Sequence, residues 1–183
     1  MIFKEDQHTE LKENPKSGTI VNEIVAFLNT CDGKIYIGVK DDGTVVGVSN
    51  VDEAMLRIAD MLSNEILPSP EALVSIDSIE EDGKSIVSIS VRKGNDLFYV
   101  KKYGRSSAGC FKRVGASARG MSEREIEYAM RKVIVAKTDI CDIPSRQSDF
   151  TFRKDGFIGA RSLEVLSLEF CCFLVEWFSN HPW

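Results

Sequence analysis

The chain has 183 residues, of which 43% are hydrophobic and 28% charged, and its formal net charge at neutral pH is −5. This composition predicts a packed globular domain of ordinary size and argues against an indiscriminate nucleic-acid binder. The five cysteines show no Cys-x-x-Cys spacing, so neither a zinc site nor a disulfide framework is favoured. No apolar run is long and uncharged enough to cross a bilayer and no leader pattern begins the chain, so we expect a cytoplasmic protein without a membrane partner.

The first fifty residues predict a helix and a hairpin in quick succession. Residues 9–12 could form a short strand, and an apolar face predicts a helix over about residues 19–28. Alternating apolar residues over 35–39 predict a buried strand, and a further strand is expected after the next turn. Each turn contains an Asp-Gly pair, and we expect Gly33 and Gly43 to supply left-handed backbone there.

Local signals continue to define elements in the middle of the chain. Asn50 and Glu53 have the spacing of a capping box, which predicts the start of a second helix. Pro68 should end this helix, because the residue before a proline avoids helical backbone. Alternating apolar residues then predict a hairpin with strands over 72–79 and 85–92.

The next segment is rich in Gly, Ser and Lys and predicts short strands near residues 97–100 and 110–114. Ser122 and Glu125 form a second capping box, which predicts a third helix that runs to about Val135. The elements together predict an α/β (α+β) fold, in which a mixed sheet of about six strands with hairpins packs against about three helices.

The predicted domain covers residues 1–140, and residues 141–183 form a C-terminal extension of different character, such as a truncated following domain. The extension includes a densely apolar stretch, Leu163–Phe178, which must pack against something if it is helical. A second copy of the chain is one candidate, so we consider a homodimer and a self-associating interaction module.

Positive charge is concentrated in one segment. Residues 92–119 carry eight basic residues and one acid, a balance of +7, which leaves −12 for the rest of the chain. Aromatic residues alternate with the cations there, a combination that suits phosphates and unstacked bases, although a solvated surface hairpin would look the same. The candidate contacts in this segment are Lys101, Lys102, Arg105, Lys112, Arg113 and Arg119.

Three ordered motifs resemble the Schlafen AlbA-like domain family over about residues 5–135. They are Glu5-x4-Glu10-Leu-Lys, the run Ile-Val-Ala-Phe-Leu-Asn-Thr-Cys-Asp-Gly-Lys-Ile-Tyr-Ile-Gly-Val-Lys-Asp-Asp-Gly-Thr-Val-Val-Gly-Val, and Phe-Lys-Arg-Val-Gly-Ala-Ser. The resemblance implies an Alba-like α/β core, nucleic-acid binding, and a place in bacterial-type proteins described as transcriptional regulators or ATP-binding proteins. ATP binding is not favoured here, because Asp82-Gly83-Lys84-Ser85 lacks the earlier glycine of a phosphate loop.

The resemblance also implies a catalytic alternative. Animal Schlafen proteins cleave RNA with three carboxylates, and Glu5, Glu10 and Asp41 stand at the matching places. Such carboxylates would hold Mg²⁺ or Mn²⁺, which can activate water, while Lys12 or Lys40 would steady the phosphate. A solvated strand edge and an ordinary turn would explain the same acids.

The leading hypothesis is therefore a nucleic-acid-binding domain of a transcriptional regulator, with DNA the expected partner. A divalent-metal-dependent endoribonuclease is the alternative from a different class.

Overall fold

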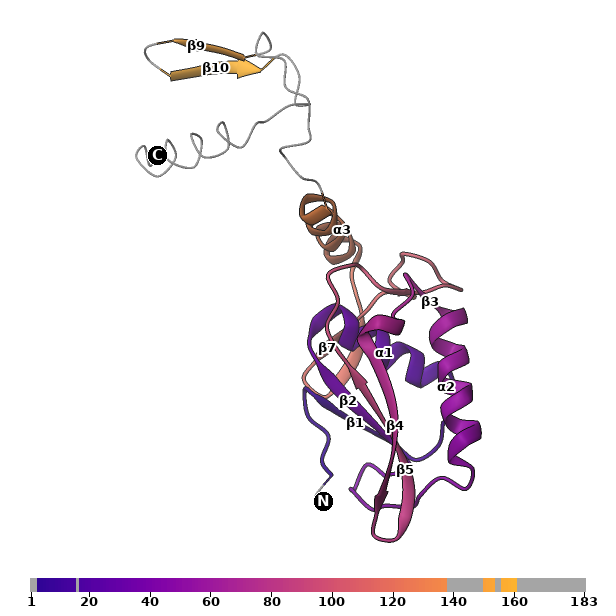
Figure 1. Ribbon diagram of the computed structural model, residues 1–183. Helices are drawn as coiled ribbons and strands as arrows, with labels where there is room; N and C mark the ends of the chain where they lie inside the picture. The colour runs from indigo at the N-terminus through magenta and orange to yellow at the C-terminus, as the bar shows by residue number, and fades with distance from the viewer. Residues whose placement is uncertain (1–2, 16, 138–149, 154–155, 161–183) are drawn as a thin grey trace. The chain divides into compact units, whose positions relative to one another are not determined.

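The computed structural model describes residues 3–15, 17–137, 150–153 and 156–160, and Figure 1 shows the order of the elements. The chain divides into two compact units, Met1–Val133 and Ile134–Trp183. The helices are α1 (Ser17–Thr30), α2 (Val51–Glu65) and α3 (Glu123–Lys137), with a short 3-10 helix η1 (Glu71–Leu73). The strands are β1 (Thr9–Lys12), β2 (Gly33–Ile37), β3 (Ile66–Leu67), β4 (Val74–Glu81), β5 (Lys84–Val91), β6 (Tyr99–Val100), β7 (Phe111–Val114), β8 (Ser117–Gly120), β9 (Phe150–Arg153) and β10 (Gly156–Ala160).

The main sheet has four strands in the order β1-β2-β5-β4. Strand β1 is parallel to β2 with Glu10 beside Ile35, while the β2–β5 and β5–β4 pairs are antiparallel. Three further antiparallel pairs, β3–β6, β7–β8 and β9–β10, lie outside this sheet, and the last of them belongs to the second unit. The predicted α+β class, with a mixed sheet and three helices, is confirmed. The described residues form more strands than the predicted six, and several of these strands are short.

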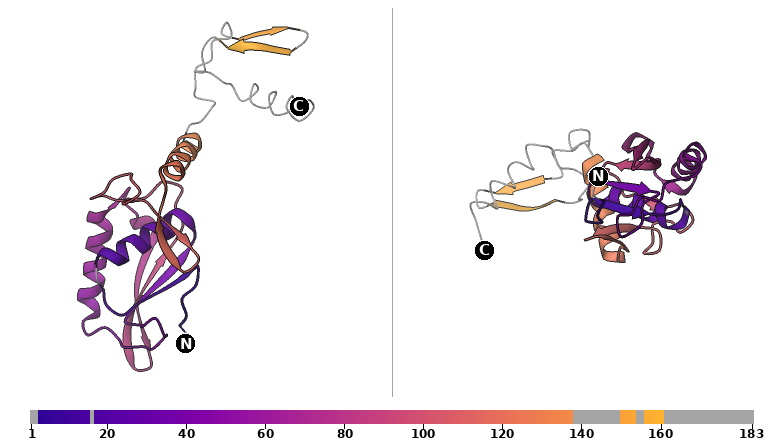
Figure 2. Two further views of the ribbon diagram at one scale, coloured as in Figure 1. Left: turned by 180° about the vertical axis from the view of Figure 1, so that it is seen from behind. Right: turned by 90° about the horizontal axis from the view of Figure 1, so that it is seen from below.

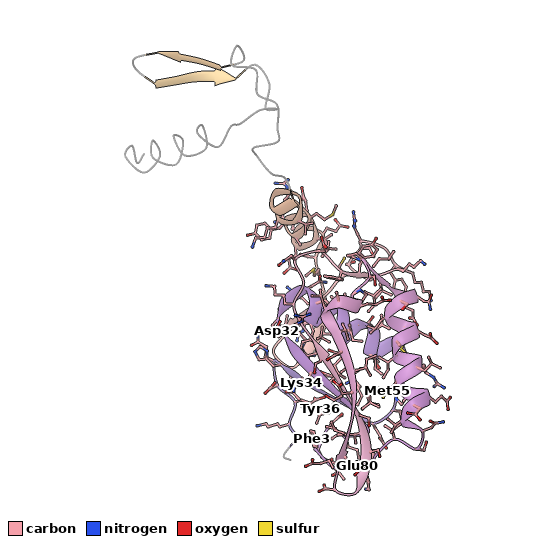
Figure 3. All side chains as sticks on the ribbon, in the orientation of Figure 1. Phe3, Asp32, Lys34, Tyr36, Met55 and Glu80 are labelled. Carbon is pink, nitrogen blue, oxygen red and sulfur yellow. The ribbon has the colours of Figure 1, made fainter. Side chains whose placement is uncertain are left out.

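Helices α1 and α2 cover one face of the main sheet, as the view from behind in Figure 2 shows for α1. Side chains alternate along β2, so Ile35 and Ile37 enter the core beneath the helices and Tyr36 points to the opposite face. On that face the ring of Phe3 packs edge-on against Tyr36 with their centroids 4.9 Å apart (Figure 3). The N-terminal segment therefore closes a second, smaller apolar cluster.

The two Asp-Gly turns differ from each other. Gly43 has φ +85°, so the expected left-handed backbone is confirmed there. Gly33 is the first residue of β2 and is not among the left-handed glycines, so that expectation is wrong. Glycine is required at position 33 by packing instead, because a Cβ there would lie 2.1 Å from the Phe27 ring. The strand expected after the second turn is reduced to a single bridge between Val39 and Val45.

The predicted helix starts are confirmed. Asn50 caps α2 by accepting a 3.1 Å hydrogen bond from the backbone N–H of Glu53. Ser122 and Glu125 make reciprocal capping bonds before α3. In the part of the chain that the structure describes, no helix has the length and apolarity needed to span a bilayer. The apolar stretch 163–178 lies outside the described residues.

Candidate nucleic-acid interface

A cluster of charged side chains lies inside the first unit, between the main sheet and α1. Arg113 on β7 has a fully buried side chain and donates from Nη1 to Glu10 Oε2 at 2.8 Å and to Glu23 Oε2. Glu10 comes from β1 and Glu23 from α1, and both carboxylates are largely buried. The cluster therefore ties β7 to two elements, β1 and α1, that lie about 90 to 100 residues earlier in the chain.

Further contacts hold the Arg113 guanidinium and backbone in place. Nη2 donates to the carbonyl of Asp6 at 2.9 Å, and the guanidinium lies over the Phe27 ring at 4.5 Å from its centroid. The backbone N–H donates to Thr30 Oγ1 at 3.0 Å. These contacts fix the position of β7. The sequence pattern predicts Arg113 as a phosphate contact, and this prediction is wrong for the described conformation, because the side chain does not reach the surface.

Burial decides the electrostatics of this cluster. Desolvation raises the pKa of Glu23, with Glu10 adding to the rise, and the Arg113 cation opposes both effects. Lys12 Nζ donates to the second carboxylate oxygen of Glu10 and to the Leu11 carbonyl at 3.0 Å. Lys12 is thus a partner of Glu10 and is not a free surface cation.

The three carboxylates of the nuclease prediction are placed differently from one another. Both oxygens of Glu10 are held, one by Lys12 and the other by Arg113. Glu5 Oε1 accepts from the Leu11 N–H at 3.3 Å, and Asp41 is exposed in the turn after β2. Among the described residues no three His, Cys, Asp or Glu side chains are grouped so that they could hold a metal ion. The donors do not fit a metal site in this arrangement, and the metal-dependent reaction stays a prediction.

The basic segment 92–119 is fastened to the last turn of α1 by one amide side chain. Asn29 Nδ2 donates to the carbonyls of Phe98 and Phe111, each at 2.9 Å, and Asn29 Oδ1 accepts from the Phe98 N–H at 2.9 Å. A single asparagine thus satisfies three backbone groups, which otherwise would be costly to bury unpaired. The segment is therefore held against the core at its centre.

Three exposed cations of this segment lie in the turn after β6, residues 101–105. Lys101, Lys102 and Arg105 are exposed, and none is in an ion pair with another described residue. Lys102 Nζ lies 5.3 Å from the centroid of the Tyr103 ring, and the guanidinium of Arg105 lies 5.4 Å from that of Tyr99. Cations beside aromatic rings present both a charge for phosphates and a flat surface for bases.

The remaining predicted cations are divided between the surface and the interior. Arg119 on β8 is exposed, and its neighbour Gly120 lies so close to Ser107 that an added Cβ would be 2.5 Å from the Ser107 carbonyl oxygen. The loop that follows the turn is therefore in contact with the β7–β8 hairpin. Lys112, opposite Arg119, pairs with Glu125 and lowers the pKa of that carboxyl to about 2. Lys40 is exposed after β2, in a separate turn.

Three polar residues of α1 were not predicted from the sequence. Glu23 belongs to the buried cluster, Asn29 holds the basic segment, and Asn22 lines a pocket at the start of α1. Each lies in α1 among apolar residues, and a polar residue on the inner side of an amphipathic helix is the one signal that could have identified Glu23 and Asn29. Their partners are up to 90 residues away in the chain, so no local pattern reveals the contacts.

Two covering helices, a four-stranded mixed sheet with one parallel edge and an attached basic hairpin define an α+β domain. A family model described as Schlafen, AlbA_2 matches residues 5–122. The chain therefore belongs to the Schlafen AlbA_2 family.

Solved structures resemble the chain at low sequence identity. The crystal structure of the DIP2311 protein from Corynebacterium diphtheriae is 16% identical with a TM-score of 0.51, and the match covers 79% of this chain and 27% of that one. At this identity the likeness shows the fold alone, and this chain corresponds to only a part of the DIP2311 protein. The N-terminal domain of a RecG-related protein from Nitrosomonas europaea is 19% identical with a TM-score of 0.46, and the match covers 60% of this chain and 79% of that one. No curated protein matches the chain.

Proposed function

We propose that this domain binds nucleic acid through the turn after β6 and the β7–β8 hairpin, and that it serves a DNA-binding regulator of transcription. The observation that carries the proposal is the exposed set Lys101, Lys102 and Arg105, which has no ion-pair partner among the described residues. The rest of the chain is acidic, so these exposed cations stand out from the overall charge, and an anionic partner would account for them. Membership of the Schlafen AlbA_2 family supports the same class of partner.

The buried cluster gives this surface a fixed shape. Arg113 and Asn29 hold the segment on both sides of the exposed turn, so the cations are presented on a backbone that is already in position. A preorganised surface loses less conformational freedom on binding than a mobile one. The contacts are expected to be with phosphates first, because cations on exposed turns carry no base pattern of their own.

A salt series tests the proposal. The full chain is titrated into labelled DNA duplex, single-stranded DNA and RNA at increasing salt, and the logarithm of affinity is plotted against that of salt concentration. Replacing Lys101, Lys102 and Arg105 together by alanine should weaken binding and flatten the slope by roughly 1 for each phosphate that is no longer neutralised. A matched variant removes Arg57, Arg131 and Lys132, three exposed cations on α2 and α3, and should change the slope much less.

Equal effects of the two triple variants would contradict the assigned surface. Single-stranded DNA and DNA duplex that both bind more weakly than RNA at every salt concentration would contradict the DNA form of the proposal. The same reactions, run with Mg²⁺ or Mn²⁺ and with EDTA, test the nuclease prediction. RNA cleavage that requires the metal and is lost both in Glu10→Ala and in Asp41→Asn, which lies outside the buried cluster, would replace the binding function by an enzymatic one.

A further inference from the structure

A pocket of about 640 Å³ lies between the beginning of α1, the end of α2 and the turn after β6. Figure 1 shows β3, which follows α2 directly, at this end of the helix. The volume is within the range of sites that hold small molecules. The polar side chains on its wall are Asn22 from α1, Asn64 and Glu65 from α2, and Lys101, Lys102 and Tyr103 from the turn.

Backbone hydrogen bonds form the pocket in advance. The short β3–β6 pair places Val100 beside Ile66, and the Lys101 N–H donates to the Glu65 carbonyl at 2.8 Å. The Tyr103 N–H donates back to the Val100 carbonyl at 3.0 Å, which closes the turn. The turn is therefore fixed against the end of α2 by the fold, and a ligand would not have to order these two sides of the pocket.

The wall offers an aromatic ring, amides and cations within one cavity. Tyr103 is 49% exposed although it is large and aromatic, which leaves much of its ring open to solvent. The side-chain amides of Asn22 and Asn64 make no hydrogen bond with any described residue. Each amide can donate and accept, as the hydrogen-bonding edge of a nucleobase does. Lys101 and Lys102 add positive charge at the same place.

We propose that this pocket receives one unpaired nucleotide of a single-stranded nucleic acid. The base stacks on Tyr103, its edge meets Asn22 and Asn64, and a flanking phosphate is bound by Lys101 and Lys102. A base inside a duplex is stacked on both faces and has its pairing edge occupied, so it cannot make these contacts. The inference rests on the proposed function and specifies the form of nucleic acid that this surface takes.

A nucleotide unit could reach the pocket as part of a strand or as a free mononucleotide, and both share the same chemistry. The strand is favoured because exposed cations continue beyond the pocket at Arg105 and Arg119. The hairpin that carries Arg119 is in contact with the loop after the turn, through Gly120 and Ser107. A chain of several phosphates would use all of these charges, whereas a mononucleotide would leave most of them unpaired.

The test compares two labelled single strands of equal length and equal phosphate charge. One strand has natural bases and the other is built of abasic residues. We expect the natural strand to bind about 5- to 150-fold more tightly, the range measured for stacking of one base on an aromatic side chain. Tyr103→Ala should remove most of the difference between the natural and the abasic strand and leave the affinity for the abasic strand unaffected. Tyr103→Phe should retain the difference, and Asn22→Ala should reduce it in part.

Tyr128→Ala is the matched control. Tyr128 on α3 is 62% exposed and has Lys132 Nζ 4.8 Å from its ring centroid, but it does not line the pocket. This variant should bind both strands as the wild type does.

Equal binding of the natural and abasic strands, with the salt dependence intact, would overturn the inference and leave the proposed function standing. A loss of both strands in Tyr103→Ala would also overturn it. A mononucleotide that competes as effectively as the strand would replace the strand as the occupant and refute the proposal. The absence of binding to every nucleic acid would refute both this inference and the proposed function.

Discussion

Arg113 is a cation held entirely inside the protein between two carboxylates. Breaking such a pair from one side leaves uncompensated buried charge, which is the costly case. Arg113→Leu should therefore lower the free energy of unfolding by about 3–5 kcal/mol. Denaturant unfolding of the full chain measures this. Arg131→Leu is the control, since Arg131 pairs with Glu127 on the exposed surface of α3 and should cost no more than about 1 kcal/mol.

The same experiment separates lost charge from lost packing. If the cost of Arg113→Leu comes from the stranded carboxylates, adding Glu23→Gln to it should recover part of the stability, because the amide carries no charge to bury. Recovery is expected to be incomplete, since Glu10 is still present in the cluster. A double variant as unstable as the single one would show that Arg113 acts mainly through its packing against Phe27.

Glu125 provides a pH-dependent prediction at the same scale. A hydrogen bond from Lys112, followed by that from the Ser122 backbone N–H, lowers the pKa of Glu125 from 4.5 to about 2 in the folded protein. A carboxyl whose pKa falls on folding stabilises the fold above the unfolded value, and this contribution is lost as the pH falls from about 4.5 towards 2. The stability difference between the wild type and Glu125→Gln should therefore shrink over this interval.

Thermal unfolding of both proteins across the acid range measures the effect, and an NMR titration of the Glu125 carboxyl gives its midpoint directly. Glu127→Gln, on the same helix, serves as the comparison. A stability difference between the wild type and Glu125→Gln that is the same at every acid pH would contradict a lowered pKa for Glu125.

At the scale of elements, the success of sequence reasoning depends on how local the determining contacts are. The capping boxes at Asn50 and Ser122 and the β4–β5 hairpin involve residues close in sequence, so they could be predicted. The parallel β1–β2 pair and the contact between Glu10 and Arg113, 103 residues apart, could not, because nothing in either segment specifies its partner. The candidate cations were predicted as a group, but the burial of Arg113 depends on that distant contact.

Gly33, the first residue of β2, packs directly against the Phe27 ring of helix α1. A Cβ at this position would lie 2.1 Å from the Phe27 ring, which is fully buried and cannot move aside freely. Gly33→Ala should therefore destabilise the fold by about 1–3 kcal/mol, the usual cost of overpacking a core. Gly18→Ala provides the contrast, because no atom lies within 4 Å of its added Cβ. Denaturant midpoints of the two variants measure the difference, and equal midpoints would show that Phe27 repacks without cost.

At the scale of the whole molecule, the distribution of charge matters more than its sum. A net charge of −5 conceals a basic segment of +7, so the mean composition misleads about the partner. If the domain binds nucleic acid as proposed, the acidic remainder repels the polyanion and directs it to the basic segment, which favours one orientation of binding over many. This is why the proposed function depends on a few exposed cations and not on overall charge.

The packing of the described residues gives a last prediction, about how much of the chain the function needs. Within residues 3–133 the buried apolar side chains lie between Phe3 and Ile126, and the family match ends at residue 122. The predicted domain of residues 1–140 should therefore fold alone, with the denaturant midpoint and the nucleic-acid affinity of the full chain.

Sedimentation of both forms tests the predicted role of the extension, since only the full chain should self-associate if the apolar stretch 163–178 forms the interface. A shortened chain that unfolds earlier would place stabilising contacts beyond residue 140, and one that binds nucleic acid more weakly would require the extension, or the dimer it forms, as part of the binding surface.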